Sequence, residues 1–144
     1  MNRIVVGVDE SDSSKNALSW AIREAQLHGA EVVAVHAWST PAMTGPIPFD
    51  GVALDTIDWE DEARASLERT VKEVANGADI AIQTRLVNKS ASAALVAASD
   101  AADLLVVGSR GRGGFAGLLL GSVGQQCAHH AHCPVVIVRG ERPA

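Results

Sequence analysis

The feature that most constrains this chain is a series of short apolar runs that are continuous rather than alternating. The first covers residues 4–8, and similar runs follow at Glu31–Ala37, Leu104–Gly108 and residues 134–139. A strand with apolar side chains on both sides is typical of a parallel sheet that is covered on both faces. The runs therefore predict a buried parallel sheet rather than an antiparallel sheet with one solvated face.

Segments in which apolar residues recur at helical spacing separate these runs. Ser11 or Asp12 can cap the first helix, and Gly29 can end it. Further helices are expected over residues 58–76 and 90–101 and from about residue 122. An additional strand at residues 79–87 alternates in character, which places it near an edge of the sheet. Strands that alternate with helices predict an α/β fold, and 144 residues suit a single domain over residues 1–144.

The charge balance argues against several classes of partner. With 17 acidic and 12 basic residues, the net charge of −5 gives no general attraction to nucleic acid or to an anionic membrane. The apolar start of the chain is too short for a secretory signal, and no run approaches the roughly 20 residues of a membrane span. Without an export signal, Cys127 and Cys133 are expected to be free thiols in a cytoplasmic protein.

The segment from Gly108 to Ser122 carries the clearest chemical signal. It is rich in glycine, follows a predicted strand and leads into a predicted helix. Ligands of open parallel sheets bind beyond the carboxyl ends of the strands, where glycine lets the backbone approach a phosphate. The N–H groups at a helix N-terminus also favour an anion. The plainer alternative is a surface loop in which Ser122 is an ordinary N-cap.

Two better-known phosphate motifs do not explain this segment. A P-loop requires a lysine before its last hydroxyl residue, and the sequence Leu120-Gly121-Ser122 has none. Residues 111–116 match a dinucleotide fingerprint. However, no acidic residue lies about 20 positions further on, and only one strand follows, too few for that fold.

The spacing Gly108-x2-Gly111-x9-Gly121-Ser122 resembles the ATP-binding signature of the universal stress protein family. Residues 4–11 and 133–139 are similar to the same family, so the resemblance runs the length of the chain. It implies a five-stranded parallel sheet in the order 3-2-1-4-5 with helices on both faces. ATP would lie over the reversal between the first and fourth strands.

The resemblance also implies which residues hold the nucleotide. The implied set is Val8, Asp9, Glu10, Ser11, Ala37, Val87, Gly108, Arg110, Gly111, Gly121, Ser122, Val123 and Gly124. Asp9 and the backbone near Ala37 would face the adenine, residues 108–111 the ribose and first phosphates, and residues 121–123 the outer phosphates. Magnesium is expected with the ATP, positioned by Asp9 or Glu10. Two positions depart from the family: Asn88 follows Val87 where glycine is frequent, and Gly124 stands where a hydroxyl residue is frequent.

Three functions are compatible with this pattern. The first is a stress-response sensor or regulator that binds ATP, or a related adenine nucleotide, with little or no hydrolysis. The second is a slow nucleotide hydrolase or transferase on the same scaffold. No Ser-His-Asp or Cys-His pair and no P-loop lysine can be assigned, so no catalytic residue is predicted. The third, an interaction protein that has lost its nucleotide, disagrees with the intact glycine signature.

Two other groups of residues carry weaker signals. His129, His130 and His132 lie near both cysteines, but Pro134 ends the helix, so histidines that favour its dipole are expected rather than a metal site. Residues 39–56, which are rich in proline and glycine, are expected to form a lid, with Trp38 placed to cover a nucleotide.

A homodimer through the last strand, residues 134–139, is also expected. In the order 3-2-1-4-5 this strand is an edge, and no charge or proline between Pro134 and Arg139 discourages pairing. Antiparallel pairing with a second copy would satisfy the edge, and the family resemblance points to the same contact. The alternative is that the strand packs only within its own sheet and that the tail after Gly140 shields it.

Overall fold

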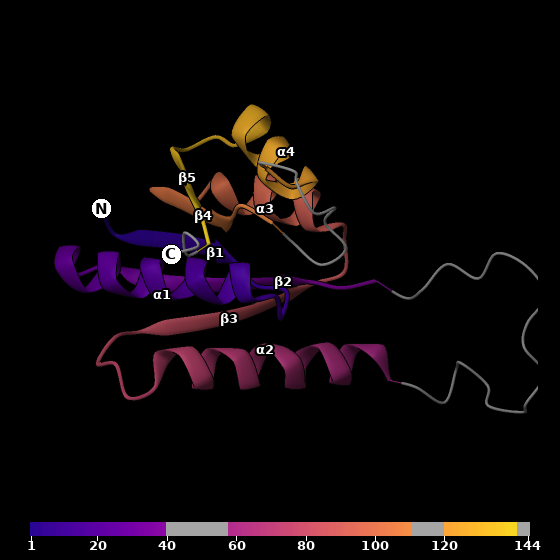
Figure 1. Ribbon diagram of the computed structural model, residues 1–144, viewed down its shortest axis with the longest axis horizontal. Helices are drawn as coiled ribbons and strands as arrows, with labels where there is room; N and C mark the ends of the chain where they lie inside the picture. Colours follow the sequence, from indigo (N-terminus) through magenta and orange to yellow (C-terminus); the bar gives the residue numbers. More distant parts are fainter. Residues whose placement is uncertain (40–57, 111–119, 141–144) are drawn as a thin grey trace, which may run out of the picture.

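A computed structural model describes residues 1–39, 58–110 and 120–140. In these residues, five parallel strands form one sheet in the order β3-β2-β1-β4-β5 (Figure 1). The strands are β1 (Arg3–Gly7), β2 (Glu31–Ala37), β3 (Ile82–Val87), β4 (Leu104–Gly108) and β5 (Val135–Val138). The helices are α1 (Asp12–His28), α2 (Trp59–Ala75), α3 (Ala91–Ser99) and α4 (Ser122–His130). The predicted α/β fold and its strand order are confirmed.

Helices cover both faces of the sheet and create two apolar layers. α1 and α2 pack on one face, whereas α3 and α4 pack on the other. Successive residues of a strand point to opposite faces. Ile4 and Val6 therefore enter the layer beneath α1, and Val5 enters the layer beneath α3. Because the side chains on both faces of the strands are buried, the strands contain continuous apolar runs.

Side-chain caps determine where three of the helices begin. Ser11 accepts a hydrogen bond from the Ser14 N–H at the start of α1, and Asp58 and Ser90 cap α2 and α3 in the same way. α1 ends at Gly29, whose φ of 67° lies in the left-handed region that glycine adopts without strain. Within residues 1–39, 58–110 and 120–140, no helix has the length and apolar character needed to cross a bilayer.

Two strands are shorter than the sequence suggests. β3 begins at Ile82 rather than at residue 79, because the N–H groups of Ala78 and Ile80 donate back to Ala75 and Ala78 and close a turn after α2. β5 begins after Pro134, which has no N–H group for the ladder. The prediction that β3 lies at an edge is confirmed, and its central residues are exposed.

The two cysteines are free and lie in or against the layer beneath α3 and α4. Cys127 is fully buried, and Cys133 is half-buried. Burial is the main cause that raises the pKa of Cys127 from 9.0 to about 11, and the neighbouring Cys133 adds to it. Burial also raises the pKa of the Cys133 thiol. Both groups therefore remain neutral thiols at physiological pH.

The raised pKa of Cys127 makes stability depend on pH in the alkaline range. The unfolded thiol ionises near its ordinary pKa, so the unfolded chain loses a proton that the folded chain keeps until about pH 11. Its contribution to the free energy of unfolding is thus constant below about pH 8 and falls by about 2 kcal/mol by about pH 10.5. Urea titrations at the two pH values measure this. Between these two pH values, the free energy of unfolding of Cys127→Ala should fall by less than that of the wild type. An equal fall in both proteins would contradict the assignment of this raised pKa to Cys127.

Candidate functional site

The predicted site residues gather at the edge of the sheet where the carboxyl ends of the strands lie. The strand order reverses at β1, which has β2 on one side and β4 on the other, and ligands of open α/β sheets bind at this position. Val8, Asp9, Glu10 and Ser11 follow β1, Ala37 and Val87 end β2 and β3, and Gly108 and Arg110 end or follow β4. Gly121, Ser122, Val123 and Gly124 form the start of α4, and Gly111 lies outside the described residues.

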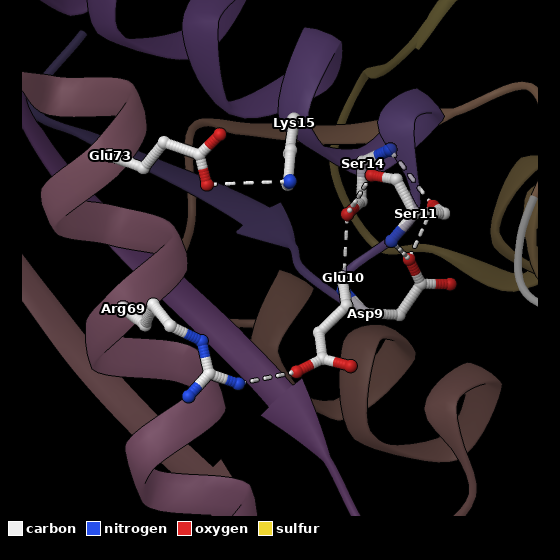
Figure 2. A network of polar contacts seen from close by, with 7 residues as sticks. All are labelled: Asp9, Glu10, Ser11, Ser14, Lys15, Arg69 and Glu73. Atoms are coloured by element: carbon white, nitrogen blue, oxygen red, sulfur yellow. Dashed lines mark hydrogen bonds and ion pairs between the residues drawn. The ribbon is translucent and has the colours of Figure 1, made fainter.

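Asp9 is held in place by two serines at the start of α1 (Figure 2). Its N–H donates to Ser14 Oγ at 3.1 Å, and its Oδ1 accepts from the Ser11 N–H at 3.0 Å and from the Ser11 hydroxyl at 2.5 Å. Ser11 Oγ in turn accepts from the Ser14 N–H at 3.1 Å. These bonds fix both the backbone and the carboxylate of Asp9 relative to the first turn of α1.

Glu10 extends from the same turn toward α2. Arg69 of α2 donates to Glu10 Oε1 at 3.1 Å, and the two side chains are 63% and 37% exposed, respectively (Figure 2). One helical turn further along α2, Glu73 accepts from Lys15 of α1 at 3.3 Å. The sequence provides no signal for either pair, because each joins residues that are far apart in the chain.

The N-terminus of α4 has no side-chain cap among the described residues. Gly121 is the N-cap, so Ser122 is the first helical residue, and the alternative in which Ser122 caps the helix is wrong. The Gly121 N–H donates to the Ser109 carbonyl at 2.7 Å, and the Ser109 N–H donates to the Val138 carbonyl at 2.9 Å. The helix start is thereby held against the end of β4, and its dipole favours a negative charge at that point.

Gly108 is required by packing within the protein. A Cβ on this residue would overlap Ser13 Oγ and would lie 2.7 Å from the Ser13 carbonyl oxygen. Ser13 Oγ also accepts from the Arg110 N–H at 3.1 Å. The first turn of α1 thus contacts the end of β4 as well as the end of β1. The sequence gives no signal for Ser13, because its contacts are with residues about a hundred positions away.

Gly124 is buried, and other atoms of the protein leave little room for a side chain there. A Cβ here would lie 2.6 Å from Leu120 Cδ1 and 3.8 Å from the Gly108 carbonyl oxygen. In the family that the sequence resembles, a hydroxyl residue is frequent at this position. Here such a residue would displace the Leu120 side chain. Leu120 is also tied to α4, because its carbonyl accepts from the Gln125 side chain at 3.0 Å.

His36, His129 and His130 lie in positions that suit structural roles. His36 Nδ1 lies 2.7 Å from the Val8 carbonyl oxygen, which can only accept, so this nitrogen carries the hydrogen. His129 and His130 occupy the last turn of α4, where a positive charge suits the dipole. Across the described ranges 1–39, 58–110 and 120–140, no three His, Cys, Asp or Glu side chains are grouped to hold a metal ion. The predicted lid over residues 39–56 lies, apart from Ser39, outside these ranges.

The reversal of strand order and the uncapped helix beside it define a doubly wound α/β domain that can hold a ligand at its carboxyl edge. The chain belongs to the universal stress protein family, whose profile matches residues 1–139. A universal stress protein of Mycolicibacterium smegmatis is 36% identical in an alignment 146 residues long, which covers 98% of this chain and 49% of that relative. The chain spans about half the length of the curated relatives that it matches.

Solved structures of the same family share the fold over nearly the whole chain. A universal stress protein in complex with cAMP is 29% identical, with a TM-score of 0.72 over 97% of this chain and 98% of the other. The universal stress protein from Archaeoglobus fulgidus in complex with dAMP is 25% identical, with a TM-score of 0.67 over 95% and 97% of the two chains. These two relatives thus have an adenine nucleotide in common.

Proposed function

We propose that this protein binds ATP, or a related adenine nucleotide, and acts as a regulatory or sensor module of the stress response with little or no hydrolysis. The observation that carries the proposal is the uncapped N-terminus of α4, held against the carboxyl end of β4 beside the fixed turn that contains Asp9. An anion there would accept from backbone N–H groups and gain from the helix dipole. The complexes of related proteins with cAMP and dAMP support an adenine nucleotide as the source of the anion.

The nucleotide would lie along the edge from β2 to α4. We assign the adenine to Asp9 and the backbone at Ala37, and the outer phosphates to Ser122 and Val123. The remaining predicted residues would line the path between them. Such a path places the base over the α3 side of the sheet, since Ala37 and Val87 pack against the apolar layer on that side. The apolar contacts suit a planar base, and the helix start suits phosphate.

Magnesium is proposed to accompany the phosphates. Magnesium in such sites is held by one or two carboxylates together with phosphate oxygens. The Asp9 carboxylate fits this role because Ser11 fixes it at the end of β1, and the adenine contact is then assigned to the Asp9 backbone. The ion would neutralise phosphate charge, and the chain would supply the fixed carboxylate and the backbone N–H groups.

Slow hydrolysis is the alternative on the same scaffold. It would require a carboxylate that orients water, and Asp9 and Glu10 are the carboxylates at this strand end. Asp9 Oδ1 accepts two bonds from Ser11 and Glu10 Oε1 accepts from Arg69, which favours structural and binding roles for these oxygens. Release of phosphate at the 1–100 per second order typical of kinases would rule out the sensor proposal.

Mass spectrometry of the small molecule released when freshly purified protein is denatured tests the proposal. An adenine nucleotide in the released fraction, at a fixed ratio to protein, supports it. If the fraction contains a different compound at such a ratio, the assignment of ligand class is wrong.

A reducing cytoplasm, which suits the two free thiols, is the setting that we propose.

We also propose that the protein is a homodimer through β5. The apolar side chains of β5 already pack against the two layers of their own sheet: Val136 and Val138 against one, and Val135 and Ile137 against the other. Pairing would therefore supply hydrogen bonds to the backbone groups at the outer edge of β5. The carbonyls of Pro134 and Val138 face β4, because they accept from Leu105 and Ser109. The residues that alternate with these two along β5, including Ile137, therefore direct their N–H groups to the outer edge.

Ile137→Pro should separate this dimer, because proline removes an outward N–H group and keeps the bonds to β4. Light scattering should give about twice 15.0 kDa for the wild type and about 15.0 kDa for the variant. Ile137→Val keeps the N–H group and should remain dimeric. A wild-type mass near one chain would refute the dimer, and the strand would then pack only within its own sheet.

A further inference from the structure

Glu10 has a backbone conformation that its side chain does not favour. Its φ is 70°, in the left-handed region, and within residues 1–39, 58–110 and 120–140 only Asn76 among other non-glycine residues has a positive φ. Asn76 is a helix C-cap of a residue type that tolerates this region, whereas glutamate usually avoids it. Neighbouring contacts must therefore hold the turn between β1 and α1 in place.

The backbone on either side of Glu10 is held by the first turn of α1. The Asp9 N–H donates to Ser14 Oγ, and the Ser11 N–H donates to Asp9 Oδ1. The Glu10 side chain is held from a different element, since Arg69 of α2 contacts its Oε1 at 3.1 Å (Figure 2). The turn that carries Asp9 is thus attached to α1 through its backbone and to α2 through Glu10.

A second ion pair aligns the same two elements. Lys15 and Glu73 lie 3.3 Å apart, and Glu73 is four residues after Arg69 on α2 (Figure 2). The sign of the charge reverses between the two pairs: α2 presents Arg69 and then Glu73, and the facing segment presents Glu10 and then Lys15. A shift of α2 by one turn would place like charges together, so the two pairs together specify one alignment.

We propose that Arg69 is a positioning residue for the nucleotide site: through Glu10 it stabilises the left-handed turn that presents Asp9. This inference rests on the proposed function. A partly exposed ion pair contributes little to global stability. Its effect on the adjoining turn is more direct, because Glu10 lies between Asp9 and Ser11, and Ser11 holds the Asp9 carboxylate through its N–H and its hydroxyl.

One variant of position 10 makes this proposal testable. Glycine adopts a φ of 70° without strain, so Glu10→Gly removes the ion pair and also removes the need for it. We expect Arg69→Ala to weaken binding of magnesium–ATP by about two- to fivefold when Glu10 is present, and to have no effect in the Glu10→Gly background. Arg69→Lys restores the charge and should recover most of the affinity. Calorimetry of the four proteins in this cycle, and of Arg69→Lys, measures these changes.

Arg64→Ala is the matched control. Arg64 lies on the same helix, is similarly exposed and pairs with Glu60 at 3.4 Å within α2, so its loss removes a comparable arginine without touching the turn. Its affinity for magnesium–ATP should equal that of the wild type. Equal losses in Arg64→Ala and Arg69→Ala, or an undiminished effect of Arg69→Ala in the Glu10→Gly background, would overturn the proposal.

Amide NMR of the nucleotide-free protein separates this proposal from the proposed function. Arg69→Ala should shift the amide signals of Asp9, Glu10 and Ser11, and Arg64→Ala should leave them unchanged. If the wild type binds no nucleotide, the proposed function fails, but these shifts still show that Arg69 positions the turn. Unchanged signals in Arg69→Ala would overturn the positioning role even where nucleotide binds.

Discussion

Replacement of Gly121 by glutamate is expected to lower the affinity for ATP by at least about 100-fold. The new carboxylate would occupy the N-terminus of α4, where it repels phosphate and competes for the same N–H groups. Each charge-assisted hydrogen bond contributes about 1.5–3 kcal/mol, so the loss of two is sufficient for this effect. Gly121 is buried, but its backbone, with φ −71° and ψ 168°, is extended, so a side chain causes no backbone strain there. Calorimetry with magnesium–ATP measures the change.

Two further variants make this test specific. Ser122→Glu places the same charge on an exposed first helical residue, so it covers the case in which Gly121→Glu disturbs folding. Ala128→Glu adds the charge to the same helix about 10 Å further along, at an exposed position, and should retain wild-type affinity. Wild-type affinity in both N-terminal variants, with thermal unfolding showing intact protein, would mean that phosphate binds elsewhere.

Gly108→Ala is expected to lower the free energy of unfolding by about 1–3 kcal/mol in the absence of any nucleotide. The added methyl group would overlap Ser13 Oγ and lie 2.7 Å from the Ser13 carbonyl oxygen, so α1 must move away from the end of β4. Ser13→Ala in the same chain removes the overlap with the hydroxyl but keeps the backbone contact, and should therefore recover part of the loss. Urea unfolding measures both effects.

Gly140→Ala is the control for this substitution. A Cβ at Gly140 meets no atom within 4 Å, so the free energy of unfolding should change by no more than about 0.5 kcal/mol. If Gly108→Ala proves as stable as Gly140→Ala, the first glycine of the signature does not serve the packing of α1. Its role would then be limited to the approach of the ligand.

The fold could be predicted because its determinants are local in the sequence. Continuous apolar runs mark strands that are buried on both faces, and Ser11, Asp58 and Ser90 mark helix starts by capping chemistry. The strand order came from the family resemblance, since periodicity alone does not rank parallel strands. Strand ends were less accurate, because the turn after α2 depends on backbone bonds that no residue type announces.

The site was predictable only in part, because several of its contacts join distant residues. Glycine spacing and strand ends brought Asp9, Gly108 and Gly121 to one edge of the sheet. Arg69 and Ser13 were missed, since their partners Glu10 and Arg110 are separated from them by 59 and 97 positions. The glycines also carried an ambiguous signal: Gly108 and Gly124 are surrounded by atoms of the protein itself, which the sequence does not distinguish from a ligand.

Amide NMR during a titration with magnesium–ATP is the direct test of nucleotide binding at the carboxyl edge of the sheet. We expect the largest shifts at Ser122, Val123 and Gly124 at the start of α4, followed by Asp9 and Ala37 at the ends of β1 and β2. GTP should produce smaller shifts at Asp9 and Ala37, because the adenine is assigned to them. Binding at this edge would be contradicted if saturating ATP left the signals at the start of α4 unchanged, or if the shifts clustered at the opposite edge of the sheet.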